Sequence, residues 1–282
     1  MRIRIGYDLI YNFAAPTPLV LLLNAHPSEL YRLQKPDVPR SEPEVPIREF
    51  RDGFGNISHR LVAPRGRMRL FSETIAEDSG LPEVGVPEAW EHPVEDLPDE
   101  CLPFLLASRY CEVAEMLPIA WEMFEDTLPG WARVQAICDW VFSNIEFGYQ
   151  YARPSKTARD VFQERRGVCR DFTHLAVTFC RCMNIPARYC NGYLGDIGVP
   201  ADPNPMDYNA WMEVYLGGHW HMFDPRHNTP RIGRILMAQG RDAVDVAMTT
   251  AFGLNTLEQF IVVTEEVTPQ PLESRGASRL IR

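Results

Sequence analysis

The hydrophobic pattern of this 282-residue chain changes once, and that change limits the folds open to it. Near the N-terminus, Ile3, Ile5 and Tyr7 alternate with arginine and glycine, which is the pattern of a half-buried strand. Beyond about residue 104, apolar residues instead recur every three or four positions, as they do along amphipathic helices. The sequence therefore predicts an α+β fold in which a β-rich region precedes a mixed core.

A proline-rich acidic segment separates the two patterns. Between Pro82 and Pro103, prolines alternate with acidic residues, so neither a long strand nor a long helix can continue there. We interpret this segment as a linker. We expect an N-terminal β-rich domain over residues 1–95 with a linker to about residue 103, a core domain over 104–270, and a frayed tail over 271–282.

The core region carries start and stop signals for several helices and strands. The predicted helices cover about 104–115, 131–142, 158–165 and 169–183, and the predicted strands cover 187–194, 209–216, 219–224 and 260–263. Gly217 and Gly218 separate the two middle strands and form a two-residue hairpin signal. That turn fixes which side chains of the two strands lie opposite each other.

Charge and composition exclude several classes of function. The chain has 28 Lys and Arg against 38 Asp and Glu, so it lacks the basic surplus that nucleic-acid binding requires. Its longest aliphatic run, Leu19–Leu23, is far shorter than the ~20 residues of a membrane-spanning helix. Seven dispersed cysteines fit a reducing compartment. We expect a cytoplasmic protein with neither nucleic acid nor membrane as partner.

Cys169 is the cysteine whose position most favours chemistry. It begins a predicted helix, so unpaired backbone amides and the positive end of the helix dipole lie beside its sulfur. It also precedes Phe172 by three residues on the buried stripe of that helix, which directs the thiol toward the sheet. We therefore expect its pKa to be modestly lowered. The remaining cysteines are interpreted as small buried hydrophobes: Cys101, Cys111, Cys138, Cys180, Cys182 and Cys190.

The hairpin brings a carboxylate close to this helix. If Gly217 and Gly218 form the turn, Trp211 lies opposite Asp224, and Asn209 lies on the same face as Trp211. We expect these three side chains to share a face with Cys169. A nucleophile at a helix start, with partners on adjacent strands, is the layout of a thiol acyl-transfer site.

The motifs around these residues resemble those of the bacterial transglutaminase-like superfamily, which is related to papain-like cysteine proteases. They are RGVCRDFTHL at 166–175, IPARY at 185–189, GY at 192–193, AW at 210–211 and FD at 223–224. The resemblance is dense over about 150–230, and it implies a papain-like core accompanied by the β-rich N-terminal region of bacterial members. It also implies that Cys169 is the nucleophile, Asp224 the carboxylate, and a peptide or protein the substrate.

One position departs from the family pattern. The family's histidine, directly before Ala-Trp, falls on Asn209, whose amide cannot act as a general base. Loss of a general base commonly costs about 10²–10⁴ in rate. We predict a cysteine hydrolase or acyltransferase scaffold with impaired turnover. The alternatives are a non-catalytic protein that binds peptides in the same groove and an active enzyme in which Asn209 is an introduced substitution.

Four other histidines were weighed as replacements. His219 and His221 have the parity opposite to Asp224, and His174 lies about 140° around the helix from Cys169. His227 follows a proline where register cannot be projected, so it is the one replacement that remains open. The resemblance implies mainly structural roles for His174 and His227.

Metal and substrate-binding residues are less strongly indicated. His219 and His221 lack a third ligand, so we expect neither a metal nor a cofactor. Trp211 and Tyr151, with Tyr149 beside it, are the candidates for the wall of a peptide groove. The sequence does not indicate an oligomeric state.

Overall fold

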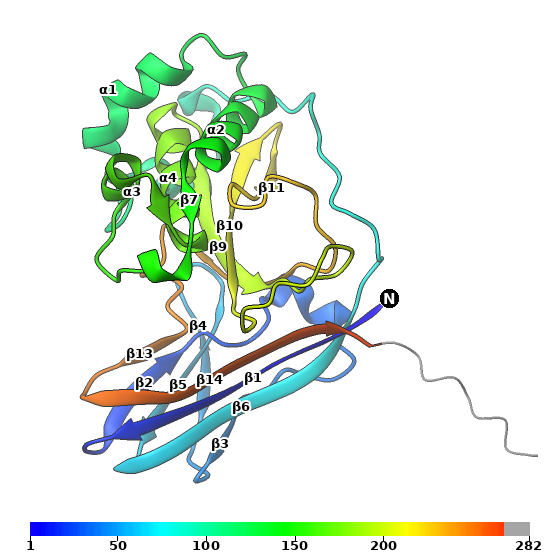
Figure 1. Ribbon diagram of the computed structural model, residues 1–282, viewed down its shortest axis with the longest axis vertical. Helices are drawn as coiled ribbons and strands as arrows, with labels where there is room; N and C mark the ends of the chain where they lie inside the picture. Colours follow the sequence, from blue (N-terminus) through cyan, green and yellow to red (C-terminus); the bar gives the residue numbers. More distant parts are fainter. Residues whose placement is uncertain (268–282) are drawn as a thin grey trace, which may run out of the picture.

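Two β-sheets built largely from N-terminal strands fill one half of the molecule, and four helices packed on a third sheet fill the other (Figure 1). The computed structural model describes residues 1–267. Its mixed helix and sheet architecture confirms the predicted α+β class. None of the helices in residues 1–267 is long and apolar enough to cross a membrane.

The N-terminal strands follow the alternation of the sequence. In β1, Ile3, Ile5 and Tyr7 are all buried, as the period-2 pattern predicts. The sheets have the orders β14-β1-β6-β3 and β13-β2-β5-β4. Their N-terminal members are β1 (Arg2–Phe13), β2 (Thr17–Leu21), β3 (Arg40–Glu42), β4 (Arg48–Arg51), β5 (Ile57–Ala63) and β6 (Gly66–Glu77), with the short helix η1 (Pro27–Arg32) between β2 and β3.

The last two strands return to these N-terminal sheets. β13 (Thr249–Ala251) pairs with β2, and β14 (Asn255–Glu266) pairs antiparallel with β1 along most of its length. The strand predicted at 260–263 therefore exists, but it belongs to the β-rich half and not to the core. The expected core range of 104–270 has to be shortened accordingly. The predicted tail at 271–282 lies outside the described residues.

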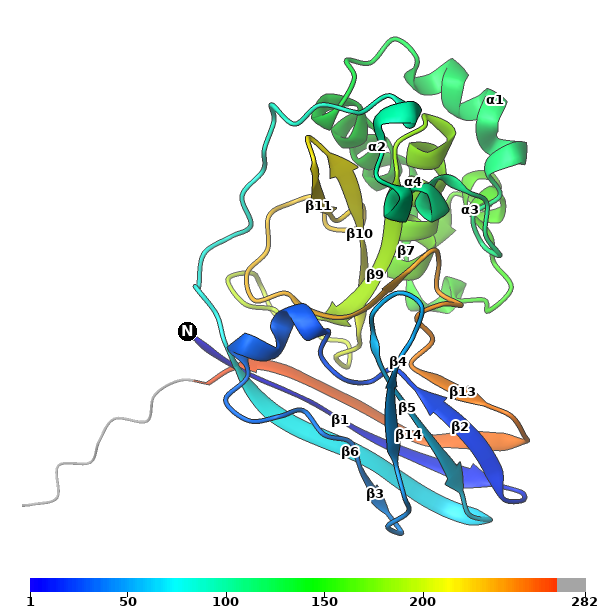
Figure 2. The same ribbon diagram turned by 180° about the vertical axis from the view of Figure 1, so that it is seen from behind.

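The proline-rich segment runs along the outside of the molecule from the β-rich half to the helices (Figure 2). It contains the short helices η2 (Val94–Asp96) and η3 (Asp99–Leu105), and it buries Leu97 and Cys101. The helix predicted at 104–115 is wrong. Phe104 belongs to η3, and α1 (Val113–Phe124) begins only after a turn in which Ser108 and Cys111 exchange backbone hydrogen bonds.

The remaining predicted core elements are present. The helices are α2 (Trp131–Asn144), α3 (Ala158–Glu164) and α4 (Cys169–Cys182), with the short pieces β7 (Glu146–Phe147), η4 (Tyr149–Tyr151) and β8 (Arg166–Gly167) between them. The sheet has the order β11-β10-β9-β12, from β9 (Ala187–Tyr193), β10 (Asn209–Leu216), β11 (His219–Phe223) and β12 (Ile235–Gly240). Helix α4 packs on β9 and β10 and supplies the centre of the helical core.

The β10–β11 hairpin has the predicted register. Leu216 pairs with His219, Val214 with His221, and Met212 with Phe223. Both turn glycines have positive φ values, 57° at Gly217 and 86° at Gly218, which suits a two-residue hairpin turn.

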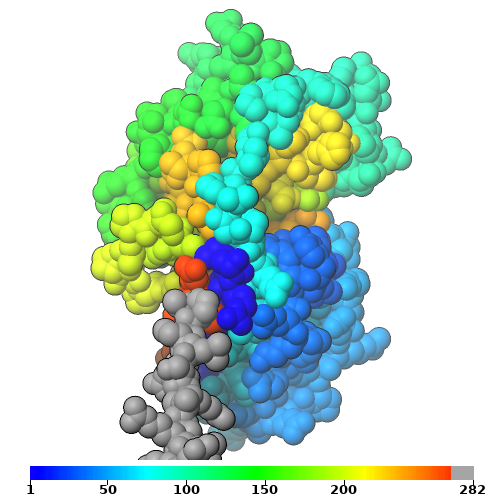
Figure 3. Space-filling view, turned by 90° about the vertical axis from the view of Figure 1, so that its right-hand side faces the viewer, coloured from blue at the N-terminus to red at the C-terminus, as the bar shows by residue number. Residues whose placement is uncertain are grey.

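One hydrophobic cluster spans the two halves of the chain. This buried cluster contains Ile3 and Leu9 of β1 together with Tyr193 of β9 and Ile235 and Met237 of β12. Figure 3 shows the proline-rich segment, in cyan, lying across the face between the two halves. The N-terminal sheets therefore help to fix the position of the β9–β12 sheet, on which the candidate site is built.

Candidate functional site

The turn before α4 places Cys169 at the first residue of the helix. Within this turn, the Asp171 carboxylate accepts a hydrogen bond from the Val168 backbone amide at 3.0 Å. A Cβ on Gly167 would lie 2.6 Å from Cβ of Asp171, so only glycine fits this turn. Arg170 pairs with the buried Asp171 carboxylate at 3.0 Å. These contacts hold the helix start, and with it the thiol, in one place.

Cys169 opens into a cavity of about 340 Å³ at the end of the β9–β12 sheet. Its thiol packs against a small apolar cluster that includes Tyr189, Ala210 and Val246. Leu22, from the β-rich half, belongs to the same cluster. The cavity wall also carries polar groups and further apolar ones, among them Tyr149, Asn191, Asp207, Asn209 and Met248. The cavity is therefore mostly apolar and contains a reactive type of side chain.

The pKa of Cys169 differs from the sequence-based expectation. Burial and the nearby Asp207 carboxylate raise the pKa of the thiol to about 11. The backbone amides of Ala210 and Arg170 and the guanidinium of Arg226 favour the thiolate, but burial outweighs them. The expectation of a lowered pKa is wrong, because the thiol is only partly exposed and the apolar cluster covers it. The thiol is protonated at neutral pH unless a base takes its proton.

Asp224 lies directly after β11 and is almost completely buried. Its Oδ2 atom accepts hydrogen bonds from Arg234 at 2.8 Å and from Nδ1 of His227 at 2.9 Å. Its Oδ1 atom accepts the backbone amides of Arg226 and His227 at 3.1 and 3.0 Å. Burial opposes the ionisation of Asp224, but Arg234 and His227 overcome it and hold the carboxyl pKa well below its usual value. Asp224 is therefore a buried carboxylate that orients His227.

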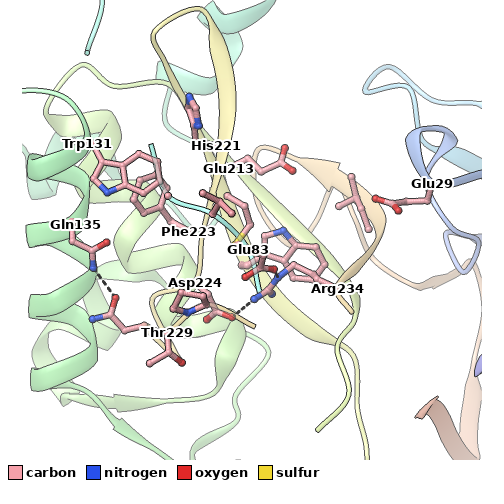
Figure 4. A pocket seen from close by; sticks show the side chains of 17 residues that line it. Glu29, Glu83, Trp131, Gln135, Glu213, His221, Phe223, Asp224, Thr229 and Arg234 are labelled. Carbon is pink, nitrogen blue, oxygen red and sulfur yellow. Dashed lines mark hydrogen bonds and ion pairs between the residues drawn. The ribbon is translucent and has the colours of Figure 1, made fainter. Parts of the chain in front are cut away.

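Arg234 also supports the Asp224 carboxylate. Its guanidinium lies over the Trp211 ring, 4.5 Å from the centroid, and pairs with Glu83 at 2.7 Å as well as with Asp224. Figure 4 shows Asp224 and Arg234 joined by a hydrogen bond, with Glu83 beside them, in a second cavity of about 320 Å³. Sequence reasoning missed Arg234 because it lies directly before β12, a strand that the hydrophobic pattern did not predict.

Asn209, at the first residue of β10, occupies the position of the expected histidine. It lines the cavity of Cys169 and also a neighbouring cavity of about 230 Å³ that contains His227. Its side-chain amide donates to the backbone carbonyl of Leu194 at 3.2 Å. Among residues 1–267, the hydrogen-bond partners of the Asp224 carboxylate are Arg226, His227 and Arg234, and Asn209 is not one of them. The structure thus brings Asn209 to the cavity of Cys169 without joining it to Asp224.

Trp211 lies elsewhere than expected. The thiol packs against Ala210, and strand alternation turns the neighbouring Trp211 to the other face of β10. There Trp211 packs with Cys190 and Leu236 and lines the second cavity, as Asp224 also does. The expectation that Trp211 and Asp224 share a face with Cys169 is wrong, although the hairpin pairing on which it depended is right.

The tyrosine candidates separate in the structure. Tyr149 lines the cavity of Cys169. Two residues later, the hydroxyl of Tyr151 donates a hydrogen bond to Glu146 at 2.9 Å, and the Tyr151 ring lies against Arg166. Tyr151 is not among the described residues that line this cavity, so Tyr149 replaces it as the candidate for substrate contact.

The other histidines lie away from the thiol. His174 is fully buried, stacks between Tyr110 and Tyr189, and accepts the Ala243 backbone amide at 3.1 Å through Nε2. Its burial holds its pKa well below the usual value, so it is a neutral packing residue. Neither His219 nor His221 is among the described residues that line the cavity of Cys169.

Comparison with known proteins agrees with this architecture. Residues 120–225 match the family model of the transglutaminase-like superfamily. An uncharacterised protein of Mycobacterium leprae is 31% identical over 120 residues, which are 40% of this chain and 42% of that protein, so the match spans less than half of this relative. An uncharacterised protein of Mycobacterium tuberculosis is 26% identical over 241 residues, 78% of this chain and 76% of that protein.

A solved structure is similar over nearly the whole chain. A candidate cysteine protease from Cytophaga hutchinsonii superposes with a TM-score of 0.79 and 29% sequence identity. The superposition covers 96% of this chain and 93% of that one. The similarity therefore includes the β-rich half as well as the papain-like half.

Proposed function

We propose that this chain is a cysteine hydrolase or acyltransferase that acts on peptide or amide bonds of a protein substrate, because residues 120–225 match the family model of the transglutaminase-like superfamily. The observation that carries the proposal is the position of Cys169. Its thiol stands at the first residue of a buried helix and opens into a cavity of about 340 Å³. A nucleophile at a helix start, facing an apolar cavity, suits attack on a carbonyl carbon.

The proposed reaction has two steps. The sulfur of Cys169 attacks the carbonyl carbon of the amide, the amine leaves with a proton, and a thioester remains on the enzyme. Water or an acceptor amine then attacks the thioester and regenerates the thiol. The backbone amide of Cys169 is the first candidate for stabilising the oxyanion, because amides at a helix start have no partner within the helix.

Two features favour slow turnover. Asn209 supplies no imidazole at the entrance of the cavity, and burial raises the pKa of Cys169 to about 11. The same two features support the competing function, a protein that binds a peptide in this cavity without cleaving it. We favour the enzyme because Cys169 at the helix start, its cavity and the Asp224–His227 pair are all present.

The cysteines bear on the compartment in which the chain works. All of the seven cysteines lie within residues 1–267, and all are free thiols. Disulfide bonds commonly form in oxidising compartments. We propose that the chain works in the cytoplasm, where Cys169 stays reduced.

The proposed function is tested with a protein substrate and two possible acceptors. Unfolded casein is incubated with the chain in the presence of hydroxylamine, and protein hydroxamate and new amino termini are measured. We expect one of these products from the native chain and none from Cys169→Ala. If the native chain and Cys169→Ala both bind casein fragments and neither forms a product, the non-catalytic alternative is correct.

A further inference from the structure

We propose that His227, oriented by Asp224, is the general base that takes the proton of Cys169 in this chain, in place of the histidine that is absent at position 209. The proposal rests on the thiol chemistry proposed above. It starts from the contact between Nδ1 of His227 and Oδ2 of Asp224, at 2.9 Å. Asp224 also accepts the backbone amide of His227, so it holds both the side chain and the backbone of this residue.

The contacts of the imidazole define its tautomer. An ionised carboxylate only accepts hydrogen bonds, so Nδ1 of His227 carries the proton that Asp224 accepts. A guanidinium only donates, and Nη1 of Arg226 contacts Nε2 of His227, so Nε2 presents its lone pair. A neutral imidazole with Nδ1–H bound to a carboxylate and an unprotonated Nε2 is the arrangement that a histidine base requires, and Nε2 becomes available when Arg226 releases it.

His227 and Cys169 occupy adjoining cavities. The cavity of His227, about 230 Å³, and the cavity of Cys169 share three wall residues, which are Tyr149, Asp207 and Asn209. Arg226 connects the two sites, because it contacts the imidazole and its charge acts on the thiol of Cys169. The side chain of Asn209 is therefore part of the boundary between thiol and imidazole, where it can hold a water molecule by hydrogen bonds.

The surroundings of His227 keep it neutral at physiological pH. Burial lowers its pKa, Asp224 raises it, and the charges of Arg226 and Arg231 lower it further. The other charged groups that face this cavity are carboxylates on the loop before β10: Asp196, Asp202 and Asp207. Because the net shift is downward, the imidazole is unprotonated near neutral pH and can accept a proton from a group in direct or water-bridged contact.

The proton balance of the step is simple. The proton of the Cys169 thiol moves to Nε2 of His227, through one water molecule beside Asn209, while Arg226 gives up its contact with Nε2. The imidazolium is stabilised by Asp224, and the thiolate attacks the carbonyl carbon. The imidazolium then returns the proton to the departing amine. Arg226, released from Nε2, remains a positive charge near the sulfur.

The test uses p-nitrophenyl acetate as the acyl probe and follows p-nitrophenol release from pH 5 to pH 10. For the native chain, the rate of p-nitrophenol release should rise with pH at or below pH 6.5, as His227 loses its proton, and then reach a plateau. His227→Gln should abolish this pH-dependent rise and lower the rate at pH 7 by a factor of about 10²–10⁴. His219→Gln is the matched control, because His219 is exposed and lies away from the cavity, and it should behave as the native chain.

Each outcome separates the proposal from the function on which it depends. If the native chain acylates no faster than Cys169→Ala, the proposed function itself fails. If acylation depends on Cys169 but is unchanged in His227→Gln, the function stands and His227 is not the base. If His227→Gln unfolds, the pH dependence of the native chain still tests the proposal. A rate of p-nitrophenol release that climbs steadily toward the thiol pKa of about 11, without a plateau, overturns it. Recovery of the lost pH-dependent rise in the double variant Asn209→His, His227→Gln supports it.

Discussion

Replacing Asp224 by asparagine removes the negative charge from the most buried ion pair of the site. The side chains of Asp224 and Arg234 are 3% and 7% exposed and lie 2.8 Å apart. Asparagine keeps the shape but leaves Arg234 with Glu83 as its remaining anionic partner. Breaking a buried pair by removing one member costs about 3–5 kcal/mol. Because Glu83 remains, we expect the free energy of unfolding to fall by about 3 kcal/mol.

The assay is thermal unfolding followed by tryptophan fluorescence. For a chain of this size, a loss of about 3 kcal/mol lowers the melting temperature by roughly 6–12 °C. Glu73→Gln is the control, because it removes a carboxylate from an exposed pair with Arg4, where the side chains of Arg4 and Glu73 are 42% and 51% exposed. Exposed pairs contribute less than about 1 kcal/mol, so this variant should melt within about 4 °C of the native chain.

The pH dependence follows from the direction of the pKa shift of Asp224. Its pKa is lower in the folded chain than in the unfolded chain, so its stabilisation is present above the unfolded value of about 3.9 and is lost as the pH falls below it. The difference between the native chain and Asp224→Asn should therefore be constant from pH 5 to pH 8 and shrink below about pH 4. Equal melting temperatures of the two proteins at pH 7 would refute the reasoning.

Three further predictions test other parts of the structure. Iodoacetamide should label Cys169 first in the native chain, because the other cysteines are buried; earlier labelling of Cys138 or Cys190 contradicts this. Between pH 7 and pH 5, the free energy of unfolding of His174→Gln should fall by up to about 2 kcal/mol less than that of the native chain. The reason is that a buried neutral histidine loses its stabilisation as the pH falls below 6.5. Identical acid melting curves contradict this. Gly130→Ala should destabilise the chain by more than about 1 kcal/mol, whereas Gly53→Ala should have little effect, because the new Cβ at Gly130 lies 2.6 Å from the Ala89 carbonyl and φ there is 84°; equal stabilities of the two variants contradict this.

Local signals in the sequence predicted much of the fold. The alternation of β1, the Thr157 cap of α3, the start of α4 and the register of the β10–β11 hairpin all depend on residues within a few positions of one another. Such signals do not report long-range pairing. The return of β13 and β14 to the N-terminal sheets is decided by burial against β1 and β2, about two hundred residues away, and it could not be seen in the pattern.

The sequence indicated which residues form the candidate site better than it indicated how they are arranged. Cys169 was placed correctly at the helix start, but its pKa depends on Leu22 and Asp207, which come from other parts of the chain. Strand alternation placed Asn209 and Trp211 on one face, yet Asn209 reaches the cavity of Cys169 because it is the terminal residue of β10.

The pairing of His227 with Asp224 was the other part that sequence reasoning missed. Its signal was the short spacing of the two residues across Pro225. A spacing of three residues permits the contact but does not require it, since the backbone turn after β11 decides where the imidazole points. In the structure, Asp224 accepts both the ring and the backbone amide of His227, and this contact made it the candidate base.

The central claim is that Cys169 is the acyl-accepting nucleophile of this chain. It is tested most directly by mixing the chain with p-nitrophenyl acetate at pH 7, quenching with acid before deacylation, and mapping the acetyl group by peptide mass spectrometry. We expect one acetyl group per chain, on Cys169, which is lost in Cys169→Ala and strongly reduced in His227→Gln. Acetyl groups on another cysteine, on lysines alone, or on no residue at all would contradict it.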